Sequence, residues 1–177
     1  MRPTDKIKNM FQKLHTPTSS QLDKKIHEEI SSAMRNEYPK RWAENTKPYP
    51  GIPELLDELQ KIKLPMTVLS NKSDDFTQIM VKSLLPSWKF EVVRGLTENA
   101  APKPDPASTL HIADELRIPP HEFLYLGDTD VDMQTANAAG MYAVGVLWGF
   151  RTAEELKSNG AKSLIENPLD VLKLLDS

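Results

Sequence analysis

Residues 123–132 read Phe-Leu-Tyr-Leu-Gly-Asp-Thr-Asp-Val-Asp, and this stretch says most about the fold. The apolar run at 123–126 predicts a buried β-strand, and three carboxylates follow it at alternate positions. In open α/β sheets, ligands bind just beyond the carboxyl ends of the strands. We therefore expect a parallel sheet with a polar ligand site at the end of this strand.

Strand and helix patterns alternate on both sides of this stretch. Further strands are predicted at 66–69, 90–93, 142–146 and 163–165. Helices are predicted between them at 53–62, 76–84, 106–116, 131–139 and 153–158, and again from residue 168. Such alternation is typical of an α/β fold, a parallel sheet covered by helices on both faces.

The beginning of the chain has a different character. Residues 1–50 carry ten basic and six acidic side chains, whereas residues 51–177 carry twelve basic and nineteen acidic ones. Only helix patterns occur before position 48, and a proline-rich turn follows at 48–53. We therefore divide the chain into a helical module at 1–47 and an α/β core at 48–177.

Composition narrows the classes of function. The chain has 177 residues, a net charge of -3 and no cysteine, which excludes disulfides, thiolate metal sites and a cysteine nucleophile. It has neither the apolar run of a signal peptide nor an apolar stretch of about 18 residues. We expect a cytoplasmic protein that binds neither nucleic acid nor membranes.

The acidic cluster fits a magnesium site. Asp128, Asp130 and Asp132 supply hard oxygen ligands, and Mg²⁺ accepts one or two protein carboxylates together with water and phosphate oxygens. A solvated acidic turn with helix-capping aspartates fits the same spacing. A calcium-binding EF-hand does not fit, because its sixth and twelfth positions would be Met133 and Ala139 instead of Gly and Glu.

Two other polar residues stand where a ligand could reach them. Ser70 follows the strand at 66–69 and could bind a phosphoryl oxygen or, together with Ser73, cap the next helix. Lys103 lies in the loop Ala-Pro-Lys-Pro-Asp-Pro at 101–106, whose prolines stiffen the backbone. Such a loop could aim the lysine at a ligand or simply expose it on a rigid connector.

The order of three motifs resembles that of the haloacid dehalogenase superfamily. The motifs are Ser70 after a strand, Lys103 in Lys-Pro-Asp-Pro, and Gly127-Asp128-x-x-x-Asp132 after a later strand. The continuation at 136–150 is similar to its phosphoglycolate phosphatase branch. The resemblance covers about residues 45–177. It implies a Rossmann-like parallel sheet, with residues 1–47 as part of a helical cap.

The resemblance also implies a chemistry and a set of site residues. The chemistry is Mg²⁺-dependent hydrolysis of a small phosphorylated metabolite through an aspartyl phosphate. Ser70, Asn71 and Lys103 would bind the phosphoryl group, and Lys103 would also stabilise developing charge. Asp128 and Asp132 would hold Mg²⁺. A phospho-acceptor signalling domain, which uses similar residue types, is disfavoured because its acidic residues precede the hydroxyl and the lysine.

One family motif is missing from this sequence. The superfamily's nucleophile lies in Asp-x-Asp-Gly-Thr after the first strand, and no such segment occurs among the 177 residues. We expect an N-terminally truncated member whose sheet lacks that central strand, between the strands at 66–69 and 123–126. Such a chain would be inactive alone, and the alternative is a non-catalytic phosphate-binding, Mg²⁺-binding or regulatory remnant. Unpaired strand edges would favour self-association.

Overall fold

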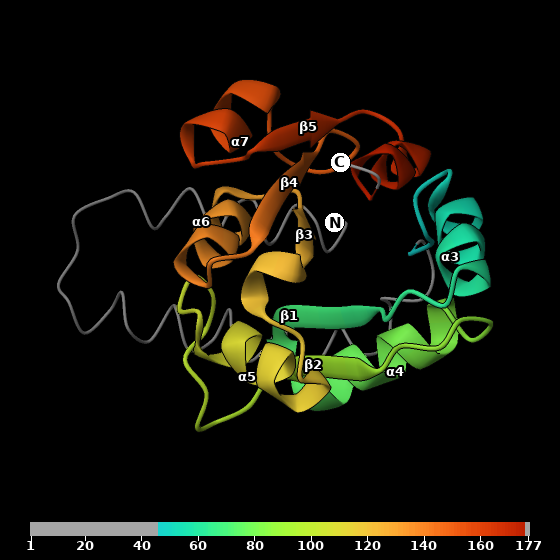
Figure 1. The fold of residues 1–177 in the computed structure, drawn as a ribbon. Helices are drawn as coiled ribbons and strands as arrows, with labels where there is room; N and C mark the ends of the chain where they lie inside the picture. Colours follow the sequence, from blue (N-terminus) through green and yellow to red (C-terminus); the bar gives the residue numbers. More distant parts are fainter. Residues whose placement is uncertain (1–45, 176–177) are drawn as a thin grey trace, which may run out of the picture. The chain divides into compact units, whose positions relative to one another are not determined.

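The computed structural model describes residues 46–175 (Figure 1). The contacts of the chain divide it into two units, residues 1–47 and 48–177, and every described helix and strand belongs to the second unit. The helical cap predicted at 1–47 lies outside the described residues, apart from positions 46 and 47, which are in neither helix nor strand.

Strands and helices alternate through the second unit, as the sequence pattern predicts. The strands are β1 (Thr67–Ser73), β2 (Val92–Leu96), β3 (Leu124–Gly127), β4 (Tyr142–Val146) and β5 (Ser163–Ile165). The α-helices are α3 (Ile52–Lys61), α4 (Asp74–Leu84), α5 (Ala107–Leu116), α6 (Asp130–Ala138) and α7 (Ala153–Ser158). Short 3₁₀ helices occupy η1 (Pro120–Glu122) and η2 (Pro168–Leu174). All described strand pairs are parallel, which confirms the α/β prediction.

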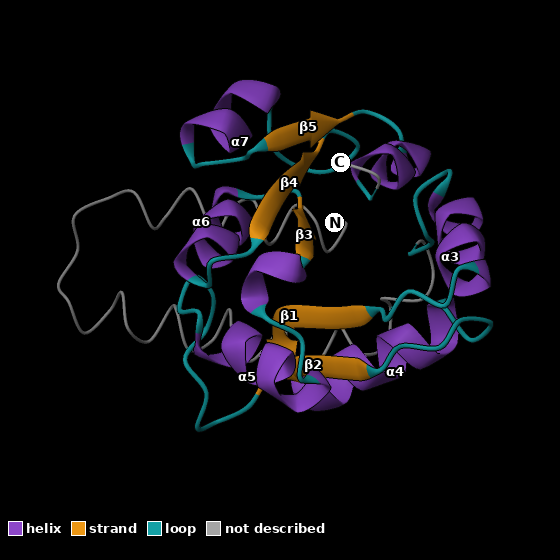
Figure 2. Ribbon diagram, in the orientation of Figure 1, coloured by secondary structure: helices purple, strands orange, loops and turns teal. Residues whose placement is uncertain are grey.

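The strands form two separate sheets (Figure 2). One contains β1 and β2, and the other contains β3, β4 and β5 in that order. Within residues 46–175, no strand pairs with the second edge of β1 or with the second edge of β3. The interruption falls between the same two strands as the predicted gap. Leu126 of β3, the strand that borders the interruption, is 37% exposed.

Helices cover both faces of the three-stranded sheet. Val144 and Val146 of β4 belong to a core cluster with Leu55 and Leu59 of α3 and with Val171 of η2. The intervening Ala143 belongs to the second cluster, which includes residues of α6 and α7. Successive side chains on a strand point to opposite faces, so β4 separates the two clusters. No helix within 46–175 is long and apolar enough to cross a bilayer.

Strand β1 is longer than the sequence pattern suggests because its end is irregular. Leu69 pairs with Arg94, and the next pair joins Ser73 to Leu96, so residues 70–72 lie opposite a single residue of β2. That residue is Gly95, where an added Cβ would lie only 2.6 Å from the Asp74 Cα. The resulting β-bulge turns residues 70–72 out of the regular ladder.

Candidate functional site

The bulge at the end of β1 is tied to the loop that follows β2. The Asn71 side chain donates to the carbonyl of Lys103 at 3.1 Å and accepts from the backbone N–H of Lys103 at 2.8 Å. The oxygen and the nitrogen of the Asn71 side-chain amide therefore both bind the backbone of Lys103. This contact brings together two of the residues expected in a phosphate site.

Lys103 connects this pair to the other sheet. Its ammonium group lies 2.6 Å from Oδ1 of Asp132, which is on α6 directly after β3. Only 14% of the Lys103 side chain and 9% of the Asp132 side chain are exposed. An ammonium group has three donors, so Lys103 can serve Asp132 and still donate to a ligand oxygen.

Thr129 fixes the carboxylate of Asp132. Its hydroxyl donates to Oδ2 at 2.6 Å and accepts from the Asp132 backbone N–H at 3.2 Å. The backbone N–H of Thr129 donates to the same carboxylate oxygen at 3.2 Å, which completes a capping box at the start of α6. Asp132 is thus a helix-capping residue as well as the partner of Lys103.

Asp128 is held by the loop after β4. Its Oδ2 accepts from the backbone N–H of Phe150 at 3.0 Å, and its carbonyl accepts from that of Arg151 at 3.2 Å. Gly149 is required here, because an added Cβ would overlap side-chain atoms of Asp128. No described residue donates a hydrogen bond to the other carboxylate oxygen of Asp128.

Ser70 and Asp130 have local partners. The Ser70 hydroxyl accepts from the backbone N–H of Lys72 at 3.1 Å, inside the bulge. It therefore does not cap α4, whose N-cap is Ser73 without a side-chain hydrogen bond. The hydroxyl proton of Ser70 is left for another acceptor. Asp130 lies 3.7 Å from the guanidinium group of Arg151.

The carboxylates at this site form a small donor set for Mg²⁺. Within residues 46–175, no three His, Cys, Asp or Glu side chains are grouped so that they could hold a metal ion by themselves. Mg²⁺ is commonly bound by one or two carboxylates, with water and phosphate completing its six ligands. The open oxygen of Asp128 fits that smaller set. Both oxygens of Asp132 already accept from Lys103 or Thr129, so Asp132 would share an oxygen with Mg²⁺ or bind it through water.

Comparison with known proteins identifies the family. The family model described as haloacid dehalogenase-like hydrolase matches residues 3–146, a range that contains Ser70, Asn71, Lys103, Asp128 and Asp132. The chain belongs to this family. Similarity is high to the phosphoglycolate phosphatase of Aquifex aeolicus, which is 30% identical over 156 residues, 88% of this chain and 72% of that protein.

Other members of the hydrolase family are longer than this chain. The phosphoglycolate phosphatase of Escherichia coli K12 is 30% identical over 132 residues, and the match spans 75% of this chain but 52% of that protein. A solved structure from Lactobacillus delbrueckii, named as a candidate phosphoglycolate phosphatase, superposes with a TM-score of 0.79 at 26% identity. The superposed region covers 89% of this chain and 64% of the Lactobacillus chain.

Tyr125 of β3 is a site residue that sequence reasoning missed. The Lys103 ammonium group lies 6.0 Å from the centre of its ring. The Tyr125 hydroxyl is buried and has no hydrogen-bond partner among the described residues. Burial, and to a lesser degree the charge of Asp132, raise the pKa of this hydroxyl well above its ordinary value. Its place in an apolar strand gave no signal beyond that of a core residue.

Replacing Tyr125 by Phe should leave stability unchanged or increase it by about 1 kcal/mol, because a buried hydroxyl without a partner is unfavourable. The ring beside Lys103 is kept. Urea denaturation of the two proteins measures the difference. A loss of 1 kcal/mol or more would mean that the hydroxyl has a partner in solution.

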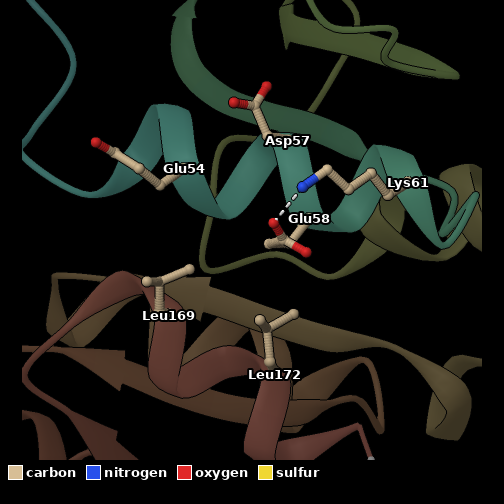
Figure 3. Close-up of a pocket in the computed structure, with 6 residues that line it drawn as sticks. All are labelled: Glu54, Asp57, Glu58, Lys61, Leu169 and Leu172. Carbon is tan, nitrogen blue, oxygen red and sulfur yellow. Dashed lines mark hydrogen bonds and ion pairs between the residues drawn. The ribbon is translucent and has the colours of Figure 1, made fainter.

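A groove elsewhere in the fold has three of its four charged side chains engaged within the protein. It has a volume of about 330 Å³ and lies between α3 and η2 (Figure 3). Its lining consists of charged side chains of α3 and two leucines of η2: Glu54, Asp57, Glu58, Lys61, Leu169 and Leu172. Lys61 bonds Glu58, and Asp57 accepts from the Trp88 indole at 2.8 Å. None of the predicted site residues contributes to this groove.

Proposed function

We propose that this chain binds Mg²⁺ and the phosphoryl group of a small phosphorylated metabolite at the site around Lys103. The observation that carries the proposal is the buried contact of 2.6 Å between Lys103 and Asp132, with Lys103 held in place by Asn71. The irregular end of β1 and the segments that follow β2 and β3 thereby converge. The family relation supports the choice of a phosphoryl group as ligand.

Each residue has a distinct task in this proposal. Asp128 and Asp132 would hold Mg²⁺, whose charge would offset that of the phosphoryl group. Lys103 would donate to a phosphoryl oxygen while it keeps its bond to Asp132. Asn71, which contacts the Lys103 backbone, and Ser70, the residue before it in the bulge, would supply neutral hydrogen-bond donors. The arrangement gives the ligand positive charge and hydrogen-bond donors in a partly buried place.

We further propose that the chain by itself turns over phosphomonoesters very slowly. Hydrolysis in its family passes through an aspartyl phosphate, and these 177 residues contain no Asp-x-Asp-Gly-Thr motif. Uncatalysed phosphomonoester hydrolysis is so slow that acceleration can approach about 10²¹-fold. In a serine hydrolase, positioning and charge without the covalent residues supply only about 10³ to 10⁴-fold. A phosphate- and Mg²⁺-binding role without turnover is the second candidate, which the missing motif favours.

Titration calorimetry tests the binding proposal. Inorganic phosphate should bind more tightly when Mg²⁺ is present, because the two ligands would share one site. Asp128→Asn should weaken Mg²⁺ binding by about tenfold or more and remove this mutual effect. Asp130→Asn is the matched control, since it removes a neighbouring carboxylate that faces Arg151. Equal losses in the two variants would contradict the assignment of Asp128.

A hydrolysis assay on p-nitrophenyl phosphate separates the two candidate functions. Release of p-nitrophenol by the purified chain with Mg²⁺ should stay at the level of the buffer. Turnover that disappears in Asp128→Asn would show that a nucleophile is present and that the chain is an active phosphatase.

We also propose that the unpaired edges of β1 and β3 favour self-association. Exposed strand edges offer backbone N–H and C=O groups to a second chain. Light scattering coupled to size-exclusion chromatography should detect dimers or larger species at micromolar concentration. A monomer at all concentrations, with a single cooperative melt, would contradict this proposal.

A further inference from the structure

Phe150 carries an exposed aromatic ring on a backbone that binds Asp128, and the function proposed above does not use it. Phe150 is 84% exposed, far more than any other large apolar residue described. A single exposed apolar residue is common on protein surfaces, so exposure alone implies nothing. What distinguishes Phe150 is its attachment to the site.

The backbone that carries this ring is fixed to Asp128. Phe150 donates its backbone N–H to the carboxylate, and Arg151 donates its own to the carbonyl, at 3.0 Å and 3.2 Å. Gly149 lies so close to Asp128 that no side chain fits there. A phenylalanine side chain has two torsion angles, so a fixed backbone restricts the ring to a few places beside Asp128.

The charges near Phe150 indicate what kind of group the ring would meet. The guanidinium group of Arg151 lies 3.3 Å from Glu155 and 3.7 Å from Asp130. It is therefore already shared by two carboxylates and is poorly placed to bind a third one on a ligand. An uncharged organic group beside the ring avoids repulsion from Asp130 and Glu155.

We propose that Phe150 is a specificity-determining residue that stacks on the organic group of the bound phosphate ester and favours a flat, uncharged, aromatic group. The inference rests on the proposed function, because the phosphoryl group must lie at Asp128 and Lys103 for the rest of the ester to reach the ring. Aromatic groups stack on one another more favourably than small aliphatic groups stack on a ring.

Phosphonates test this inference without turnover, since phosphoryl transfer does not break their P–C bond. Calorimetry with Mg²⁺ would compare inorganic phosphate, methylphosphonate and phenylphosphonate. The wild-type chain should bind phenylphosphonate about three- to tenfold more tightly than methylphosphonate. Phe150→Ala should abolish that preference and leave the affinity for inorganic phosphate unchanged. Leu169→Ala, which removes an exposed side chain of η2, should keep the preference.

The outcomes separate this inference from the function on which it rests. Phosphate binding without a preference for phenylphosphonate, or an equal loss for all three ligands in Phe150→Ala, would overturn the role of Phe150 alone. A fall of several degrees in the melting temperature of Phe150→Ala would also overturn it, because the ring would then pack against the protein. Failure of inorganic phosphate to bind would overturn the proposed function and this inference together.

Discussion

Replacing Lys103 by Met is expected to lower the free energy of unfolding by about 3 to 5 kcal/mol. The substitution leaves the carboxylate of Asp132 in a place where only 9% of its side chain is exposed and takes away the cation 2.6 Å from it. Thr129 still donates to that carboxylate, which favours the lower end of the range. The loss comes mostly from a buried charge that no longer has a counter-charge.

A double variant shows whether the unpaired charge is the cause. Lys103→Met with Asp132→Asn removes both charges, so it should be more stable than Lys103→Met alone. Lys162→Met is the matched control. Lys162 also lies near a tyrosine ring, 5.4 Å from the centre of Tyr142, but it donates to the backbone carbonyl of Met141 and not to a carboxylate.

Urea denaturation followed by circular dichroism measures these differences. The free energy of unfolding of the control variant Lys162→Met should fall by about 1 kcal/mol, the usual contribution of one hydrogen bond. If Lys103→Met loses no more than Lys162→Met, the ion pair is solvated in solution and the buried site is misdescribed. If the double variant is no more stable than Lys103→Met, the unpaired charge of Asp132 is not the cause.

Most helices and strands could be predicted because their signals are local. β4, α7 and β5 begin and end at the predicted residues. The helix predicted at 131–139 is α6, which ends at Ala138, and Gly140 just beyond it has a φ of +73°, a conformation that suits glycine. The helix predicted at 53–62 ends at Lys61, and Ile62, one residue beyond it, is 56% exposed.

The end of β1 could not be predicted because it depends on a distant residue. Nothing near residues 70–72 marks a bulge, whereas Gly95 of the neighbouring strand leaves the room for it. The same bulge presents Asn71 to Lys103, a contact across 32 positions. Local patterns predicted a strand that ends at residue 69 and could not show this continuation.

The members of the candidate site could be proposed from the sequence, but their pairings could not. The rule that ligands bind at strand ends selected Ser70, Lys103 and Asp128. Lys103 and Asp128 follow β2 and β3 in the structure, whereas Ser70 lies within the irregular end of β1. The ion pair of Lys103 with Asp132 depends on how the two sheets lie within the folded unit, whereas the capping box of Thr129 with Asp132 is a local contact within the first turn of α6. Their roles toward phosphate and Mg²⁺ stay predictions until the binding experiments are done.

Replacing Gly127 by Ala is expected to lower stability by about 3 kcal/mol and to weaken phosphate binding. Gly127 is buried at the end of β3, and an added Cβ would overlap the Asp132 Cβ and lie 2.7 Å from its Cγ. These atoms are close to the backbone of α6 and cannot move far. The carboxylate must turn away from Lys103 and Thr129, which adds lost charge-assisted hydrogen bonds to the strain of overpacking.

A double-mutant cycle tests this mechanism. The losses of stability caused by Gly127→Ala and by Lys103→Met should add up to more than the loss in the double variant, because both substitutions disrupt the contact between Lys103 and Asp132. Gly140→Ala is the control for glycine chemistry alone: an added Cβ has no neighbour within 4 Å, so only its positive φ is unfavourable, by about 1 to 2 kcal/mol. Additivity within about 0.5 kcal/mol would mean that Gly127 acts independently of the ion pair. Strand end, helix cap and buried lysine would then not form one unit, and the phosphate site would have to be sought elsewhere.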